Sequence, residues 1–124
     1  MARVTKVGGI TLKTTTMSRA VAFYRDVLGL RLLYGGEKSS FSSFDVDGTY
    51  LNLEQSSHAD TGWGRIIFYC DDVDGLHRRL QMESIPAPEP RDAPWNERFF
   101  HIKDPDGHEL SMARPLTEPR RRDG

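Results

Sequence analysis

The order of apolar and polar residues predicts a strand, a helix and three more strands in the first half of the chain. Ile10 and Leu12 alternate with small or polar neighbours, which is the two-residue period of a half-buried strand. Farther along, apolar residues recur at the spacing of one helix face: Met17, Val21, Tyr24 and Leu28. We expect Ser18 to cap the start of this helix and Gly29 to end it. The next strands are expected at residues 30–34, 41–46 and 50–53.

The second half of the chain repeats this order of elements. A strand is expected at residues 65–70, and acidic residues then mark the start of a helix whose apolar stripe comprises Val73, Leu76 and Leu80. Later segments are expected as strands at 99–103 and 109–112, and as a loop or edge segment at 84–90. The dipeptides Asp47-Gly48 and Asp106-Gly107 favour tight turns at matching places in the two halves. This matching order predicts a duplicated βαβββ unit.

The duplication predicts one α+β domain made of two modules, because a single βαβββ unit would leave one sheet face uncovered. Module one is expected at about residues 7–55 and module two at about 64–116, with a linker at 56–63. Residues 117–124 contain the basic run Arg120–Arg122 and are expected to form a frayed, solvated tail.

Composition and charge argue against several partners and compartments. The chain has 124 residues, with 17 Lys and Arg against 18 Asp and Glu, so it lacks the basic excess that a nucleic-acid surface needs. No apolar stretch approaches the roughly 20 residues of a membrane span, and the start of the chain has no secretory signal pattern. The single cysteine, Cys70, cannot form an internal disulfide and is expected to be buried and inert. We therefore expect a cytoplasmic protein with no nucleic-acid or membrane partner.

Three strings of residues resemble a known family. They are Ala22–Leu30 (AFYRDVLGL), Asp71–Asp74 (DDVD) and Asp104–His108 (DPDGH). In this order, and on a duplicated unit, they are similar to the vicinal oxygen chelate superfamily, which includes glyoxalases, extradiol dioxygenases and bleomycin-resistance proteins. The resemblance covers about residues 7–115. It implies paired βαβββ modules whose mixed sheets curl into a cup, and it implies a homodimer.

The family's chemistry usually depends on a divalent metal that His and Glu side chains hold inside the cup. The resemblance places the four ligand positions at Gly9, Asn52, Arg65 and Ser111. Glycine offers no donor, arginine is a permanent cation, and serine and asparagine are weak neutral ligands. We therefore expect no metal and no other cofactor. A relocated metal would need a histidine that faces the cup, and His101 is the candidate among His58, His77, His101 and His108.

Strand alternation predicts which residues line the cup instead. The inward positions with chemistry to offer are Lys13, Tyr50, Asn52, Arg65, Tyr69, Glu109 and Ser111. Arg65 can pair with Glu109 on the adjacent strand, or its guanidinium can anchor a carboxylate ligand, and the two roles are compatible. The aromatic residues either pack in a dimer interface or form a stacking wall: Trp63, Trp95, Phe99 and Phe100. Residues 92–98 are a candidate flap over the cup.

Two classes of function remain open, with a third behind them. The first is a metal-free binding protein, like the bleomycin-resistance members, that sequesters an aromatic or carboxylate-bearing small molecule in the cup, at or near a dimer interface. The second is a glyoxalase- or dioxygenase-like enzyme (a lyase, isomerase or oxygenase) with a relocated metal, or with Glu109 or Tyr69 as a general acid or base. The third is a non-catalytic dimeric adaptor. We favour the binding protein.

Overall fold

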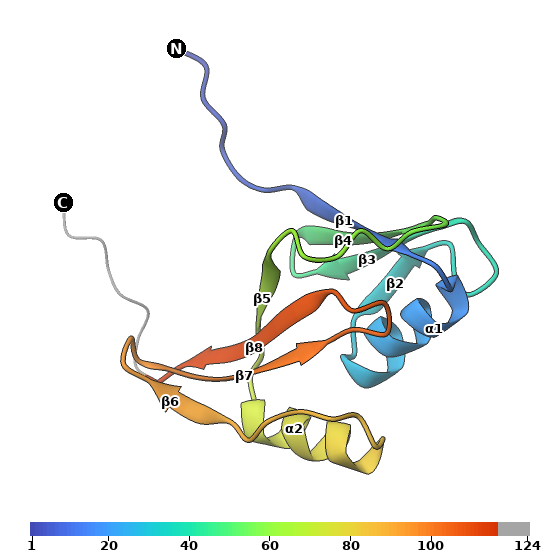
Figure 1. Cartoon of the computed structure of the whole chain (residues 1–124). Helices are drawn as coiled ribbons and strands as arrows, with labels where there is room; N and C mark the ends of the chain where they lie inside the picture. Colours follow the sequence, from blue (N-terminus) through green and yellow to red (C-terminus); the bar gives the residue numbers. More distant parts are fainter. Residues whose placement is uncertain (117–124) are drawn as a thin grey trace. The chain divides into compact units, whose positions relative to one another are not determined.

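The computed structural model describes residues 1–116 and contains two four-stranded mixed sheets with the same strand order (Figure 1). The first sheet runs β1 (Gly9–Thr14), β4 (Thr49–Gln55), β3 (Phe41–Val46) and β2 (Arg31–Tyr34). The second runs β5 (Arg65–Tyr69), β8 (Glu109–Pro115), β7 (Glu97–Lys103) and β6 (Arg91–Ala93). With one helical segment in each repeat, this arrangement confirms the predicted α+β class with two βαβββ units.

The duplication also holds in the pairing of the strands. Each repeat has one parallel pair, in which Ile10 lies opposite Leu51 in the first sheet and Ile66 opposite Leu110 in the second. The remaining pairs are antiparallel. The turn between β3 and β4 is the predicted one at Asp47-Gly48, and both residues have positive φ, at 50° and 94°. Such a turn matches the twist of the two strands that it joins.

The first helix differs from its predicted form. It is α-helical only over α1 (Met17–Ala22) and continues as a π-helical segment, η1 (Phe23–Val27), in which the Leu28 N–H donates to the Phe23 carbonyl at 3.0 Å. The wider turn accompanies burial of two adjacent aromatic rings, Phe23 and Tyr24. The prediction that Ser18 caps the helix is wrong, because Thr16 is the N-cap and its side chain makes no capping bond. Gly29 follows with φ of 78°, as predicted.

The second helix, α2 (Val73–Met82), covers one face of the second sheet (Figure 1). Its first turn is capped by Asp72, whose side chain accepts a hydrogen bond from the Gly75 N–H at 2.9 Å. The core on this face consists of the apolar stripe of the helix and alternate residues of the strands: Val73, Leu76, Leu80, Ile66, Phe100, Ile102, Leu110 and Met112. His77 belongs to this core, since its ring lies 5.4 Å from that of Phe100.

The segment at residues 92–98, the candidate flap, forms part of a β-hairpin. β6 pairs with the start of β7, and the turn between them is closed by a bond from the Asn96 N–H to the Ala93 carbonyl at 3.1 Å. Asn96 has φ of 64°, a left-handed conformation that asparagine tolerates well. Arg98 adds ion pairs to Asp92 at 2.9 Å and to Asp74 at 2.8 Å. These contacts fix the hairpin to the start of α2.

Two compact units divide the chain. The first comprises Met1–Thr61 with Asp104–His108, and the second comprises Gly62–Lys103 with the chain from Glu109 onward. The turn Asp104–His108, which the sequence assigns to the second repeat, therefore packs with the first unit. Inside that unit the Tyr24 hydroxyl donates to Asp104 Oδ2 at 2.6 Å, and His108 Nε2 lies 2.7 Å from the Lys13 carbonyl oxygen.

Two further predictions concern membranes and the end of the chain. Among residues 1–116, neither helix has the length and apolar character that crossing a membrane requires. The predicted tail at 117–124, with its basic run Arg120–Arg122, lies outside the described residues.

Candidate ligand-binding site

The face of the second sheet that points away from α2 carries five of the predicted site residues, and we call it the site face. Its strands contribute alternate side chains, as the pleat requires. They are Arg65, Ile67 and Tyr69 from β5, Glu109, Ser111 and Ala113 from β8, Glu97, Phe99 and His101 from β7, and Arg91 and Ala93 from β6. The register places Ile67, Ser111 and His101 in one row across the sheet.

Four of these residues form a polar cluster: Arg65, His101, Ser111 and Glu109. Arg65 Nη1 lies 3.1 Å from His101 Nε2, and His101 Nδ1 lies 2.8 Å from Ser111 Oγ. Because a guanidinium can only donate, Nε2 is the acceptor, and Nδ1 carries the ring proton and donates it to Ser111. Glu109 Oε1 lies 3.8 Å from Arg65 Nη2, which is a long ion pair.

The polar cluster holds His101 in its neutral form. Burial lowers the pKa of His101 below its usual value of 6.5, and the positive charges of Arg65 and Arg91 lower it further, against a smaller opposing effect of Glu109. The Arg65 and Glu109 side chains are 44% and 46% exposed, so solvent screens the attraction between them. The cluster therefore carries one guanidinium that is only partly neutralised.

A second group on the same unit is the aromatic cluster, made of Tyr69, Glu97, Trp95, Phe99 and Arg91. The Tyr69 hydroxyl and the Trp95 Nε1–H each donate to a different oxygen of Glu97, both at 2.8 Å. The Trp95 ring lies 5.6 Å from that of Phe99, and the Arg91 guanidinium lies 4.9 Å from the Phe99 ring centroid. The hydrogen bond to Glu97 is the main reason why the pKa of Tyr69 is raised.

The two clusters meet over a small apolar floor. Phe99 and His101 have ring centroids 5.1 Å apart, and Phe99 packs with Ala93 and Ala113 in a buried group. At the edges of this floor, Ile67 is 61% exposed, Tyr69 67% and Trp95 57%. The site face thus has a buried apolar group, exposed side chains beside it and a cation at one end.

Sequence reasoning missed two members of the aromatic cluster. Glu97 lies two residues before Phe99 on β7, so strand alternation places both side chains on the site face. The predicted strand began at residue 99 and therefore left Glu97 out. Arg91 comes directly after the segment 84–90, which was expected to be a loop or edge segment, and it begins β6, where it pairs with Phe99.

Three predicted site residues belong to the first unit. Asn52 Nδ2 donates to Thr11 Oγ1 at 3.2 Å, and Asn52 Oδ1 accepts from Ser43 Oγ at 2.6 Å. Lys13 forms an exposed ion pair with Asp60 at 3.0 Å, and Tyr50 is half exposed. Asn52 thus forms a neutral polar network with Thr11 and Ser43, and the cation Lys13 pairs separately with Asp60.

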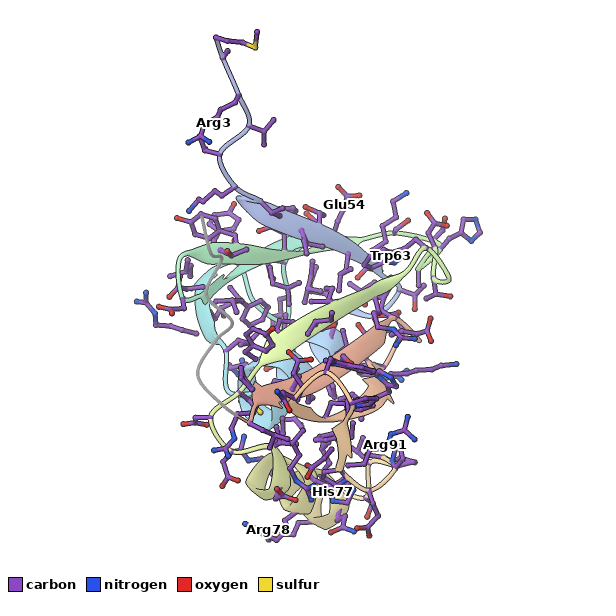
Figure 2. The ribbon with its side chains drawn as sticks, turned by 90° about the vertical axis from the view of Figure 1, so that its left-hand side faces the viewer. Arg3, Glu54, Trp63, His77, Arg78 and Arg91 are labelled. Carbon is purple, nitrogen blue, oxygen red and sulfur yellow. The ribbon has the colours of Figure 1, made fainter. Side chains whose placement is uncertain are left out.

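The remaining aromatic and cysteine predictions have mixed outcomes. Trp63 lies on the chain that leads into β5 and is half exposed (Figure 2). Phe100 lies on the α2 side and is almost fully buried, so the prediction that it forms part of a stacking wall is wrong. Cys70 has intermediate exposure, and burial is the main reason why its pKa is raised. A raised pKa lowers the thiolate fraction, which is the reactive form.

The residues at the four family metal positions do not fit a His and Glu metal centre. Asn52 and Ser111 are engaged by neighbouring side chains, and Arg65 brings a positive charge. At Gly9 a Cβ would already lie 3.2 Å from the Tyr50 carbonyl oxygen. Within the described part of the chain, no group of three or more His, Cys, Asp or Glu side chains is arranged to hold a metal ion.

Comparisons with known proteins agree on one family. Residues 6–112 match the model of the Glyoxalase/Bleomycin resistance protein/Dioxygenase superfamily. The metallothiol transferase FosB of Staphylococcus epidermidis is 26% identical over 122 aligned residues, which cover 92% of this chain and 86% of that protein.

Solved structures share the fold. Lactoylglutathione lyase from Agrobacterium tumefaciens superposes with a TM-score of 0.75 at 24% identity, covering 90% of this chain and 95% of that one. A glyoxalase/bleomycin resistance protein/dioxygenase from Nocardioides gives 0.73 at 21% identity, covering 99% and 91%.

Proposed function

This chain belongs to the Glyoxalase/Bleomycin resistance protein/Dioxygenase superfamily, and we propose that it is a metal-free member that binds a planar, carboxylate-bearing small molecule on the site face. In this proposal the positive charge of Arg65 replaces that of the family's metal ion. The ligand's carboxylate contacts the polar cluster, and its ring lies against the aromatic cluster. The binding protein works as a homodimer in the cytoplasm, and it needs no cofactor.

The observation that carries the proposal is the state of the Arg65 guanidinium. Its hydrogen bond goes to a neutral ring, that of His101, and the nearest carboxylate oxygen among residues 1–116, on Glu109, is 3.8 Å away. A guanidinium has five N–H donors, so it can still bind a carboxylate through a fork. Ser111 supports the same end, because its oxygen accepts from His101 and its own proton is left to donate to a ligand oxygen.

The aromatic cluster supports a planar ligand. The Tyr69 and Trp95 rings are mostly exposed, yet hydrogen bonds from both to Glu97 hold them in place. Rings that are fixed before a ligand arrives lose little conformational entropy on binding, so stacking on them is more favourable. On the same face Ile67 is 61% exposed and gives the ligand an apolar contact, whereas Phe99 and Ala113 are buried.

Replacing Arg65 by methionine tests the proposal. Arg65→Met keeps the apolar stem and removes the charge-assisted bonds, so binding of a test ligand, biphenyl-4-carboxylate, should weaken by roughly 2–3 kcal/mol, or about 30- to 150-fold. Titration calorimetry on wild type and variant measures the change. Arg78→Met is the matched control, because Arg78 lies on α2, which covers the opposite face (Figure 2). It should bind like wild type.

The double variant Arg65→Met with Glu109→Gln separates charge removal from loss of fold. It leaves neither partner of the long ion pair charged, and it should still bind as weakly as Arg65→Met. If it melts like wild type and also binds the probe as tightly as wild type, Arg65 is no anchor and the proposal fails.

An enzyme is the second candidate, and the similarity to the metallothiol transferase FosB favours it. Such an enzyme would use a metal at other positions, or Glu109 or Tyr69 as a general acid or base. The raised pKa of Tyr69 keeps its proton on at neutral pH and makes it a poor base. Measuring bound metal distinguishes this candidate from the binding protein.

A further inference from the structure

Resting on the proposed binding function, we propose that the ligand also carries a cationic group at the end opposite its carboxylate, and that Glu97 is the residue that selects it. The ligand class is therefore a zwitterion built on a planar, two-ring body. Its carboxylate lies at Arg65, and its ammonium-type group lies at Glu97.

Within the described part of the chain, the Glu97 carboxylate has neutral hydrogen-bond partners and no ion-pair partner. Its two oxygens accept hydrogen bonds from the Tyr69 hydroxyl and the Trp95 Nε1–H, and both donors are neutral. Among residues 1–116 no lysine, arginine or histidine forms an ion pair with it. A carboxylate has about four acceptor sites, so two remain for a ligand donor.

The nearest candidate cation is already engaged elsewhere. Arg91 lies on β6 beside the aromatic cluster, but its guanidinium sits over the Phe99 ring, 4.9 Å from the centroid. Arg98, the next residue after Glu97, points to the α2 side and pairs with Asp74 and Asp92. Neither arginine neutralises Glu97, so among residues 1–116 its carboxylate on this partly apolar face has no ion-pair partner.

The two charged ends are separated by an apolar stretch. Arg65 and Tyr69, the partner of Glu97, are four residues apart on β5, which is about 13 Å along a strand. Between the ends lie the exposed Ile67 side chain and the Phe99 ring with its buried alanine neighbours. A ligand that meets both ends must carry an apolar body about two rings long.

Three observations thus agree on the ligand class. Within the described residues, there is a cation at one end of the site face, a carboxylate without an ion-pair partner at the other, and the exposed apolar side chain of Ile67 between them. A carboxylate-only ligand would leave its far end against Glu97 and would gain nothing from that charge. A ligand with an ammonium group there gains a charge-assisted hydrogen bond to Glu97.

The test compares two probes that differ only in the cationic group. They are 4′-(aminomethyl)biphenyl-4-carboxylate, which is zwitterionic, and biphenyl-4-carboxylate, which is anionic. Titration calorimetry on the full chain should show the zwitterion binding about tenfold more tightly, as one hydrogen bond to a charged group predicts. In Glu97→Gln this advantage should vanish. The measure is the ratio of the two affinities within each protein, because Glu97 also holds the Tyr69 and Trp95 rings and its replacement weakens binding of both probes. Glu89→Gln, an exposed loop position, is the matched control and should retain the advantage.

The other outcomes contradict either this inference or the proposed function, and they can be told apart. Equal binding of the two probes to wild type overturns this inference and leaves the proposed function standing. An advantage that persists in Glu97→Gln also overturns it. Failure of both probes to bind wild type contradicts the proposed function itself. If Glu97→Gln does not fold, nuclear Overhauser effects in wild type decide: the aminomethyl protons should lie next to the Tyr69 and Trp95 rings, and contacts only near Arg65 would refute the assignment.

Discussion

His101 links the ligand anchor to the fold through two specific hydrogen bonds. It accepts one from Arg65 and donates the other to Ser111, so only the neutral ring with its proton on Nδ1 satisfies both partners. A proton added at Nε2 would break the first bond and place two cations side by side. At the residue scale, the polar cluster therefore depends on the protonation of one histidine.

This dependence predicts how stability changes with pH. The pKa of His101 is lower in the folded protein than its usual 6.5, so the unfolded chain takes up the proton first as pH falls. Its contribution to stability is therefore full above about pH 6.5 and is lost as pH drops toward the lower, folded-state pKa. Urea unfolding at about pH 7.5 and about pH 5.5 should show a larger loss for wild type than for His101→Gln. An equal loss in both proteins would contradict the prediction.

At the scale of elements, the turn Asp104–His108 depends on the first helical segment. Asp104 Oδ2 accepts from the buried Tyr24 hydroxyl, and Asp104 Oδ1 accepts from the backbone N–H groups of Asp106 and His108, both at 2.9 Å. Asp106 in turn accepts from the Thr14 hydroxyl and from the Thr15 backbone N–H and hydroxyl. Two carboxylates with several donors each hold a turn between β7 and β8 against the first unit.

Removing one donor tests this anchor. Tyr24→Phe deletes a buried hydrogen bond to a charged group and should lower the free energy of unfolding by about 1.5–3 kcal/mol. The matched control is Tyr34→Phe, because Tyr34 lies on β2 and is 67% exposed. It should change stability by less than about 0.5 kcal/mol. Urea denaturation measures both, and equal effects of the two substitutions would refute the role given to Tyr24.

At the scale of the whole molecule, the binding proposal predicts no resident metal. Protein purified without chelator should carry well under ~0.2 equivalents of Zn, Ni, Mn or Fe, and EDTA should leave its melting temperature unchanged, because no metal binding energy contributes to folding. Elemental analysis and thermal unfolding are the measurements. A stoichiometric metal that EDTA removes with loss of stability would support the enzyme instead.

The second prediction at this scale is a homodimer. Large apolar side chains, including Trp63 and Trp95, are more than half exposed in the single chain. Obligate dimers bury surfaces on the order of 2,000 Å² or more, with aromatic residues enriched at their centres. Light scattering at micromolar concentration should give about twice the chain mass of 14.1 kDa. A mass of one chain would contradict the prediction.

Local sequence patterns are enough to predict the repeated order of elements and the side of the sheet on which each strand residue lies. Both follow from local geometry, because successive strand residues point to opposite faces whatever the rest of the chain does. Alternation thus placed Arg65, Glu109 and Ser111 on one face and Leu110 and Met112 on the other, and the strand register agrees. Gly29 and Asp47-Gly48 were readable for the same reason, since their left-handed backbone is a local requirement.

The contacts that these residues make depend on parts of the chain that are distant in sequence. The Arg65–His101 bond joins residues 36 positions apart, and the Tyr69–Glu97 bond joins residues 28 apart. Which rows of side chains come together depends on the register between β5, β8 and β7, which distant backbone hydrogen bonds set. The sequence did not predict the π-helical segment, because its wider turn goes with the burial of Phe23 beside Tyr24 and not with local periodicity. It did not predict the β6–β7 hairpin either, because that hairpin depends on strand pairing across the turn at Asn96. The surroundings of Glu97 could not be predicted from the sequence for the same reason. Strand pairing and the hairpin turn bring its hydrogen-bond partners Tyr69 and Trp95 to it.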